Sequence, residues 1–291
     1  MGCASSAKAF KIGDKKNDAF KILCRTVICN MHNQVDLTVS LISHNNKKDL
    51  ELLLPSLFLA LSGINAEVLL IDNCSDDSTV DFIRHNYPEI FLRKNKSKLG
   101  YGANHNQNLA IAKGRYALLM NSDMILTPES LPLLLKFMDN NSDIGIVTPK
   151  ILNEDGTLQY LNKRYPTLLD LFLRRFLPAK FKHLFKKRLE YYEMRDVGYD
   201  SILDVPFVSG AFMFSKTDVI KAINGFDERF FMYFEDIDLC RRVQKTHGTV
   251  YYPDAVVTHR WDRAAHKSLK WTVVFINSAF HYFNKWGYNF Y

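Results

Sequence analysis

Hydrophobic runs and amphipathic stretches alternate along the first half of the chain. Continuous apolar residues predict buried strands at residues 37–42, 67–71, 90–92 and 116–120. Apolar residues spaced three or four positions apart predict helices at residues 48–62, 79–86 and 102–113. Strands that alternate with helices in this way are typical of an α/β fold with a doubly wound, mostly parallel sheet flanked by helices.

The alternation is less regular in the second half of the chain. The pattern predicts helices at residues 129–140, 216–223, 236–246 and 271–286, and strands at residues 144–147, 205–215 and 249–259. The sequence contains no internal repeat. We therefore interpret residues 37–291 as one continuous domain that ends in a helical extension.

Composition and charge restrict the class of protein. The 291 residues are 47% hydrophobic and 13% aromatic, which is enough for a packed core. The formal net charge of +7 is concentrated in residues 1–34 and 171–189, and the remainder of the chain is mildly acidic. This distribution favours two contacts with anionic surfaces over a nucleic-acid-binding face. Five scattered cysteines indicate a reducing compartment and neither a disulfide scaffold nor a zinc site.

Two segments of the chain bear on contact with membranes. The opening residues match a short N-myristoylation pattern, but we interpret residues 1–36 as a disordered leader. Between residues 168 and 190, Leu and Phe recur at helical spacing with Lys and Arg on the other face. Such a segment suits the surface of an anionic bilayer, or a solvated helix that packs its apolar stripe on the core. No apolar run reaches the roughly 18 residues that a spanning helix requires.

Polar residues follow two of the predicted strands. Asp72 ends the strand at residues 67–71, where its carboxylate can accept the imide N–H of a pyrimidine base or cap a helix. Asn121-Ser122-Asp123 follows the strand at residues 116–120, and Asp123 can hold a divalent cation together with diphosphate oxygens and water. Ligands of doubly wound sheets lie at the carboxyl ends of the strands. The alternative for both motifs is a turn that caps the next helix.

Three further motifs carry candidate chemistry. Gly100-Tyr101-Gly102-Ala103-Asn104 opens a helix whose amides can approach an anion, although the spacing is not a dinucleotide fingerprint. Glu235-Asp236 opens a helix among several aromatic residues, which partly desolvate a carboxylate and make it more basic. His259 ends a strand, where a neutral imidazole can complete a metal shell. Tight turns, helix caps and a structural histidine are the alternatives.

The order of the motifs resembles that of one known family. The series runs through Ser43-His44-Asn45, the turn from Asp72 to Ser78, the glycine motif at Gly100, Asn121-Ser122-Asp123, Gly210-Ala211-Phe212, Gly225-Phe226-Asp227-Glu228 and Glu235-Asp236-Ile237-Asp238. It resembles family 2 glycosyltransferases with the GT-A fold, within the rhamnosyltransferase-like group that builds bacterial surface polysaccharides. The resemblance covers residues 37–291. It implies a nucleotide-sugar side at residues 37–150 and an acceptor side at residues 151–291.

The resemblance also implies roles for single residues. The implied donor-binding residues are Ser43, Asn45, Asp72, Ser75, Gly100, Gly102, Asn104, Asn121 and Asp123. The implied acceptor-side residues are Gly210, Asp238 and Trp261. Asp236 is the implied catalytic base with Glu235 in support, and Asp123 and His259 are the implied ligands of Mg²⁺ or Mn²⁺. Asn121 departs from the first Asp of the usual DxD motif, and His44 stands where the family often has Tyr.

The implied activity is the inverting transfer of a sugar from dTDP-rhamnose or a UDP-sugar to a hydroxyl of a glycan or lipid-linked glycan acceptor. Asp236 would remove the proton of that hydroxyl as it attacks the anomeric carbon. The enzyme is expected in the cytoplasm, bound peripherally to the inner face of the membrane. A nucleotidyltransferase and a non-catalytic lipid-binding module are alternatives, although the turn after the first strand lacks the Gly/Arg/Lys-rich triphosphate loop of the former.

Overall fold

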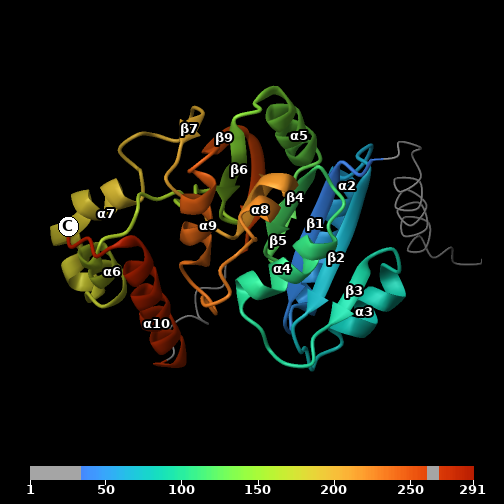
Figure 1. The fold of residues 1–291 in the computed structure, drawn as a ribbon, viewed down its shortest axis with the longest axis horizontal. Helices are drawn as coiled ribbons and strands as arrows, with labels where there is room; N and C mark the ends of the chain where they lie inside the picture. The colour runs from blue at the N-terminus through green and yellow to red at the C-terminus, as the bar shows by residue number, and fades with distance from the viewer. Residues whose placement is uncertain (1–33, 261–268) are drawn as a thin grey trace, which may run out of the picture.

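A nine-stranded mixed sheet forms the centre of the chain in a computed structural model that describes residues 34–260 and 269–291 (Figure 1). Its strands are β1 (Leu37–Ser43), β2 (Ala66–Asp72), β3 (Phe91–Lys94), β4 (Tyr116–Met120), β5 (Met124–Leu126), β6 (Ile144–Leu152), β7 (Leu203–Asp204), β8 (Phe212–Lys216) and β9 (Gly248–His259). They lie in the order β3-β2-β1-β4-β8-β6-β9-β5, and β7 pairs with β9. The sheet is parallel from β3 to β4, and β8 runs antiparallel to both β4 and β6.

The parallel strands place candidate residues along one edge of the sheet. Leu37, Val39 and Leu41 of β1 are fully buried, as expected for a strand covered on both faces. β1 pairs with β2 in the register that sets Ser43 opposite Asp72, and β4 lies on the other side of β1. The carboxyl ends of three neighbouring strands therefore open at the same edge, where ligands of doubly wound sheets bind.

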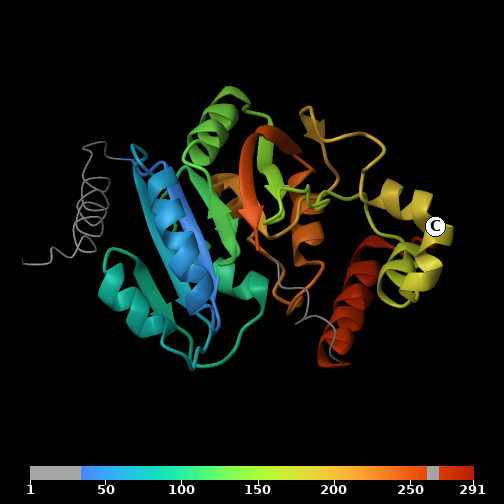
Figure 2. The same cartoon turned by 180° about the vertical axis from the view of Figure 1, so that it is seen from behind.

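Helices cover both faces of the sheet. They are α2 (Lys47–Ala60), α3 (Thr79–Asn86), α4 (Tyr101–Ile111), α5 (Ser130–Asn140), α6 (Leu168–Arg175), the 3-10 helix η1 (Ala179–Phe185), α7 (Lys186–Tyr192), α8 (Thr217–Ala222), α9 (Glu235–Val243) and α10 (Leu269–Trp286). Figure 1 shows α4, α8 and α9 on the near face, and Figure 2 shows α2 and α5 on the opposite face. The doubly wound arrangement predicted from the alternating pattern is thus observed.

The helices α6, η1, α7 and α10 lie together at one end of the molecule, beyond the sheet (Figures 1 and 2). Thr167 and Asp170 form a capping box that starts α6. Arg188 joins α7 to α6 through Asp170, with Nε 2.8 Å from Oδ1. Arg175 donates to Thr272 Oγ1 at 2.9 Å and joins α6 to α10. The amphipathic segment predicted at residues 168–190 is helical in three pieces, because Pro178 separates α6 from η1.

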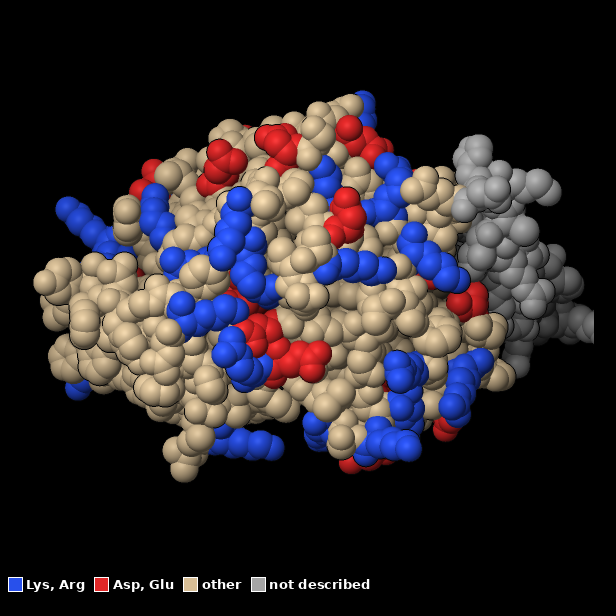
Figure 3. Space-filling model, in the orientation of Figure 1, with Lys and Arg blue, Asp and Glu red and all other residues tan. Residues whose placement is uncertain are grey.

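The outer surface of this end is largely apolar. The exposed Phe and Leu side chains of α6 and η1 are Phe172, Phe176, Phe181, Leu184 and Phe185, and those of α10 include Leu269, Val273, Ile276 and Phe280. We call these nine residues the terminal helical surface. In Figure 3 this end is mostly tan, with Lys and Arg side chains projecting from its edge.

The structure corrects some sequence-based boundaries. The predicted strand at residues 205–215 is wrong in its first part, since β8 begins at Phe212. Pro206 has no N–H to donate, and the Gly210 N–H bonds a side chain of α9 at 3.1 Å rather than a neighbouring strand. The short strands β5 and β7 were not predicted, because three and two residues are too few for a pattern. The predicted leader lies outside the described residues, except for 34–36.

Within the described ranges, no helix combines the length and the apolar character needed to cross a membrane.

Candidate active site

The carboxyl ends of β1 and β2 hold the first group of predicted donor-binding residues. Asp72 is fully buried, and its Oδ2 accepts from the Ser75 amide at 3.2 Å. The Asn45 amide donates to Ser75 Oγ at 2.9 Å, which ties the two strand ends together. Ser43 Oγ and Asp72 Oδ1 are buried without a hydrogen-bond partner among the described residues. Because such polar atoms are normally satisfied, this edge of the sheet has unused hydrogen-bonding capacity.

A cavity of about 370 Å³ lies beside these strand ends. Its wall includes Asn104, Asn121 and Asp123 from the predicted donor set. Lys98 also lines it and donates from Nζ to His44 Nε2 at 2.7 Å. Asp72 does not line the cavity, so it lies behind the wall in this structure. Lys98 supplies a positive charge that the sequence motifs did not identify.

The glycine motif shapes the wall of this donor-side cavity. A Cβ at Gly100 would lie 2.5 Å from the Phe231 carbonyl oxygen, and Tyr101 N donates to the same oxygen at 2.9 Å. A Cβ at Gly102 would lie 2.6 Å from the Phe226 side chain. Both glycines therefore allow α4 to pack closely on the 226–231 loop. They are structural in this arrangement, which leaves Asn104 as the member of the motif that lines the cavity.

Asp123 and His259 meet at the end of β9. Asp123 Oδ1 lies 3.2 Å from His259 Nε2. Gln159 Nε2 donates to the His259 carbonyl oxygen at 2.8 Å, so its Oε1 faces His259 Nδ1 at 2.9 Å and accepts a hydrogen bond from the Nδ1–H group. In the neutral imidazole, Nε2 then directs a lone pair at the Asp123 carboxylate. Two electron-pair donors this close require a cation between them, either a proton or a metal ion.

The surroundings of Asp123 favour its ionised form. Burial would raise the pKa of Asp123, but the hydrogen bond and the positive charge of a protonated His259 outweigh it and lower the pKa below the ordinary value. No group of three or more His, Cys, Asp or Glu side chains suited to a metal occurs in the described ranges. A carboxylate and an imidazole therefore fit a cation that takes its remaining ligands from a bound diphosphate and water, as Mg²⁺ commonly does.

Glu235 and Asp236 open α9 after a strained turn. Tyr233 and Phe234 both have left-handed backbone angles, with φ of 71° and 68°, which non-glycine residues rarely adopt. Asp236 Oδ2 accepts from Gly210 N at 3.1 Å, and Oδ1 accepts from Ile237 N at 2.8 Å. The turn and these amides fix the direction of the Asp236 carboxylate.

Both carboxyl groups are more basic than usual. Burial, and next the charge of Asp236, raises the pKa of Glu235 well above its ordinary value. Burial also raises the pKa of Asp236, although the Gly210 and Ile237 amides oppose the shift. Glu235 is buried and Asp236 is partly exposed, so Asp236 is the member of the pair that can reach a substrate. A basic, fixed and accessible carboxylate has the properties of a general base.

Asp123 and Asp236 line two different cavities that hydrogen bonds of Tyr101 and Gly210 connect. Asp236 borders a smaller cavity of about 170 Å³. Tyr101 lines the donor-side cavity, and its hydroxyl donates at 2.5 Å to the carbonyl oxygen of Gly210, whose amide bonds Asp236. Burial, followed by the charges of Glu235, Asp236 and Asp123, raises the pKa of Tyr101 well above its ordinary value. Tyr101 therefore connects the cavity of Asp123 to the Asp236 carboxylate through Gly210.

The structure does not place two of the predicted acceptor-side residues, Asp238 and Trp261, at a site for the acceptor. The Asp238 side chain is fully buried, accepts from Trp286 Nε1 at 2.9 Å and pairs with Arg242 at 2.8 Å. It also lies 2.7 Å from Lys285 Nζ. Asp238 therefore joins α9 to α10, and its assignment to the acceptor site is corrected to a structural one. Trp261 lies outside the described residues.

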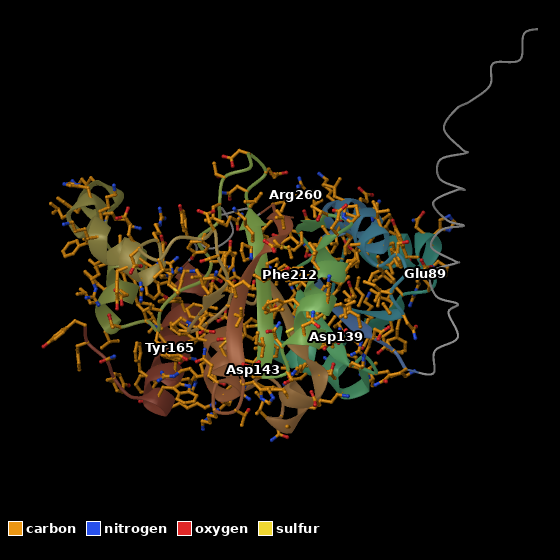
Figure 4. The ribbon with its side chains drawn as sticks, turned by 90° about the horizontal axis from the view of Figure 1, so that it is seen from above. Glu89, Asp139, Asp143, Tyr165, Phe212 and Arg260 are labelled. Carbon is orange, nitrogen blue, oxygen red and sulfur yellow. The ribbon has the colours of Figure 1, made fainter. Side chains whose placement is uncertain are left out.

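Another cavity is remote from these residues. It has a volume of about 670 Å³ and is lined by Asp143, Tyr165 and residues that follow α9. Figure 4 shows Arg260, which directly follows the metal candidate His259, at one end of the strands, and Asp143 near the other end. The metal candidate therefore lies at the opposite end of the sheet from this cavity.

Comparison with known families identifies the chain. The profile of the family described as "Glycosyl transferase family 2" matches residues 38–219. This chain is a family 2 glycosyltransferase. A profile described as "N-terminal domain of galactosyltransferase" matches residues 193–267, which include α9 and β9. The family predicted from the order of the motifs is confirmed.

Individual relatives of this glycosyltransferase agree with the assignment. It is 30% identical over 242 residues to an N-acetylglucosaminyl-diphospho-decaprenol L-rhamnosyltransferase of Mycobacterium tuberculosis, covering 77% of this chain and 75% of that protein. It is 28% identical over 165 residues to rhamnosyltransferase WbbL of Escherichia coli, covering 53% of this chain and 59% of that protein. The resemblance to the rhamnosyltransferase-like group is confirmed.

A solved structure supports the fold. Staphylococcus aureus TarS 1-349 in complex with UDP-GlcNAc has a TM-score of 0.55 and 18% identity, over 86% of this chain and 67% of that one. The GT-A fold predicted for this glycosyltransferase is therefore confirmed. Family membership decides against the nucleotidyltransferase and the non-catalytic module.

Sequence reasoning missed several residues of the site in this glycosyltransferase. Gln159 and Lys163 belong to an irregular segment without periodicity, so no pattern connects them to His259 or to Asp236. Tyr101 stands inside the glycine motif, but its contact with Gly210, 109 residues further on, arises only in the folded chain. A spacing-based search finds residues near each other in sequence, whereas these contacts join distant segments.

Proposed function

We propose that the enzyme transfers a sugar, with inversion, from a nucleoside-diphosphate donor to a hydroxyl of a lipid-linked glycan in surface polysaccharide biosynthesis. dTDP-rhamnose is the favoured donor and a UDP-sugar is the second. The rhamnosyltransferase names of the two relatives support rhamnose, and the first of them acts on a diphospho-decaprenol acceptor. The observation that carries the proposal is the link between Asp123 and Asp236: Tyr101 lines the cavity that holds Asp123, and its hydroxyl bonds Gly210, whose amide bonds Asp236.

In the proposed reaction, Asp236 acts as the general base. Its carboxylate takes the proton of the acceptor hydroxyl while the oxygen forms a bond to the anomeric carbon. The bond from that carbon to the diphosphate oxygen breaks on the opposite side, which inverts the configuration. The Gly210 and Ile237 amides hold the carboxylate in place, and Glu235 keeps its own proton because of its raised pKa.

The donor is proposed to lie in the cavity beside β1 and β4. Ser43, Asn45, Asp72 and Ser75 are the proposed contacts of the base and ribose, and the unused capacity of Ser43 Oγ and Asp72 Oδ1 supports this. Since Asp72 lies behind the cavity wall, binding requires the 73–76 turn to move. Lys98 would meet the charge of the diphosphate.

Asp123 and His259 are the proposed protein ligands of Mg²⁺ or Mn²⁺. When bound there, a divalent cation would stabilise the negative charge that grows on the departing nucleoside diphosphate. Gln159 holds the His259 ring with Nε2 toward Asp123. Asn121 carries no charge, so Asp123 is the anionic ligand of this motif.

Replacement of Gln159, which contacts His259 Nδ1, provides one test of the proposed metal site. Gln159→Leu removes the acceptor of the Nδ1 proton, and we expect Mn²⁺ affinity to fall about 10- to 100-fold, the usual effect of losing an outer-shell partner. Gln159→Glu keeps the acceptor for Nδ1 but loses the donor to the His259 carbonyl oxygen, and it is expected to bind Mn²⁺ more tightly than the Leu variant. Calorimetric titration of Mn²⁺ in the presence of a nucleoside diphosphate measures both. Equal affinity in the Leu variant and the parent would contradict the proposed ligand pair.

The donor itself can be identified by binding and transfer. Titration calorimetry with uridine and thymidine diphosphates, with and without Mn²⁺, is expected to show binding that the metal strengthens. Screening of nucleotide sugars for hydrolysis or transfer then identifies the sugar. Absence of binding by any nucleoside diphosphate would contradict the proposed function.

The terminal helical surface is proposed to bind an anionic bilayer, where a lipid-linked acceptor is presented. Its Phe and Leu side chains are exposed on α6, η1 and α10, and basic residues such as Lys180, Lys182, Lys186 and Lys187 lie between residues 174 and 188. Apolar side chains next to basic ones match the acyl boundary and the anionic headgroups of a bilayer. The enzyme would then act on the inner face of the cytoplasmic membrane.

Vesicle sedimentation tests this proposal. We expect the protein to sediment with phosphatidylglycerol vesicles at low salt and to do so much less with phosphatidylcholine vesicles. The double change Phe181→Ser and Leu184→Ser is expected to weaken binding at least about tenfold, since each buried apolar side chain contributes about 1.5–3 kcal/mol when fully inserted. The control is Leu52→Ser. Leu52 is 46% exposed, and its helix α2 lies away from the terminal helical surface (Figure 1). No sedimentation of the parent, or equal loss in the control, would contradict bilayer binding.

A further inference from the structure

The smaller cavity beside Asp236 contains cationic groups that the proposed transfer has not used. Lys163 and Arg174 line it together with Asp236, and Phe207, Tyr233 and Phe275 form apolar walls. Lys163 belongs to the irregular segment after β6, and Arg174 belongs to the last turn of α6. The cavity thus lies where the catalytic part of the chain meets the helices of the terminal helical surface.

The Lys163 ammonium is buried with few partners. The residue is 7% exposed, and the hydrogen bond of its Nζ among the described residues is a long one of 3.4 Å to the Leu161 carbonyl oxygen. An ammonium group has three hydrogens to donate, and a buried charge is costly unless it is paired. Burial, followed by the positive charge of Arg174, lowers the pKa of Lys163 to about 7. Lys163 therefore has donors that are not used by close protein partners, and an anion bound beside it would favour its charged form.

Arg174 adds a second cation at the same cavity. Its guanidinium lies 5.4 Å from the centre of the Tyr192 ring, which holds it against the wall. The Asp236 carboxylate faces the same space with the opposite charge. Two basic side chains and one carboxylate thus line the cavity, a set that can take up a phosphate group.

We propose that Lys163 and Arg174 form a subsite for the phosphate group that joins the acceptor sugar to its lipid. The inference rests on the proposed function. A hydroxyl of the first acceptor sugar would lie at Asp236, and the phosphate on the anomeric carbon of that sugar would lie at Lys163 and Arg174. The lipid would leave the cavity beside α6 toward the terminal helical surface. The subsite would thus select acceptors that carry a phosphate.

Two acceptors with the same sugar test the subsite. One is N-acetylglucosaminyl diphosphate with a short isoprenoid chain, and the other is a neutral alkyl N-acetylglucosaminide of similar chain length. For Lys163→Met we expect kcat/KM to fall about 10- to 100-fold with the diphosphate acceptor, mainly through KM, because one charge-assisted hydrogen bond is lost. With the neutral glycoside we expect less than a threefold change. Arg174→Gln, at an exposed position, is also expected to lower kcat/KM with the diphosphate acceptor more than with the neutral glycoside. Lys136→Met on α5 makes the same Lys-to-Met change away from this cavity and is the control.

Other outcomes would overturn the inference. Equal loss with both acceptors would mean that Lys163 acts on Asp236 as a counter-ion and not on phosphate. Loss of phosphatidylglycerol vesicle binding by Lys163→Met, with unchanged acceptor preference, would assign the cavity to a membrane headgroup. If the parent transfers sugar to both acceptors equally well, the subsite is wrong while the proposed function stands. If the parent transfers sugar to neither acceptor from any nucleotide sugar, the proposed function itself is in question.

Discussion

Asp236→Asn is expected to bind the donor normally and to lose about 10²- to 10⁴-fold in turnover, the usual range for removal of a general base. The amide keeps the size of the side chain, and its one oxygen can accept from one of the two backbone amides, that of Gly210 or that of Ile237. It has no free carboxylate oxygen to take the proton of the acceptor hydroxyl. Single-turnover transfer measures the chemical step, and calorimetry with the nucleoside diphosphate measures donor binding.

The pH dependence of the parent gives a second readout for the same residue. Burial raises the pKa of Asp236, so the carboxylate becomes protonated at a higher pH than an ordinary Asp. Protonation removes the base, and kcat/KM is therefore expected to fall as pH decreases through this raised pKa. Since Glu235 and Asp236 interact, the acid limb reports the pair and not one residue.

The exposed Asp254 of β9 provides a control for the Asp236→Asn variant. Asp254→Asn makes the same chemical change far from a candidate proton transfer, and its turnover is expected to match that of the parent. Turnover of Asp236→Asn within a few-fold of the parent would remove Asp236 from the mechanism.

Asp123→Asn is expected to lower turnover about 10²- to 10³-fold and to weaken donor binding. The change removes the anion that faces His259 Nε2 at 3.2 Å, and with it the charged ligand of the proposed cation. Charge stabilisation of a leaving group by a metal ion is worth several kcal/mol, which corresponds to a loss of this size. Initial rates over a range of Mn²⁺ concentrations, together with calorimetry of the nucleoside diphosphate, measure the two effects.

A substitution two residues before Asp123 serves as the comparison for Asp123→Asn. Asn121→Asp adds a carboxylate beside the same cavity and is expected to retain activity, with metal binding equal to or tighter than that of the parent. If Asp123→Asn kept both the activity and the Mn²⁺ dependence of the parent, Asp123 would not be a metal ligand.

The fold was predictable where packing follows a simple period. β1, β2, β4 and the helices between them have continuous or three-to-four spaced apolar residues, and their observed limits agree with the predicted ones to within one or two residues. β5 and β7 lack such a signal, because their pairing partner β9 and not their own sequence determines them. The 205–211 segment looked like a strand because it is apolar, yet its amides serve the site.

The site was predictable only in its acidic and glycine motifs. Asp123 and Asp236 stand out since a carboxylate next to an apolar strand or an aromatic cluster has few structural reasons to be there. Asp238 belongs to the same acidic motif, but the structure pairs it with Arg242, Lys285 and Trp286. Sequence cannot separate these outcomes, because a helix presents neighbouring residues on different faces.

The relation between the two cavities is the central point of the proposed mechanism. Asp123 and Asp236 line separate cavities, and Tyr101 of the first cavity is hydrogen-bonded to Gly210, whose amide bonds Asp236. For one anomeric carbon to be reached from both sides, the sugar of the donor must extend past Tyr101 toward Asp236. The Tyr101 hydroxyl already donates its one hydrogen to the Gly210 carbonyl oxygen, so toward the sugar it can act only as an acceptor.

A structure with a non-hydrolysable nucleotide sugar and Mn²⁺ tests this most directly. The prediction is that the metal lies between Asp123, His259 and the diphosphate, with the anomeric carbon open to the cavity that holds Asp236. A sugar bound wholly on the Asp123 side, with Tyr101 and Gly210 between its anomeric carbon and the Asp236 carboxylate, would contradict a single transfer site.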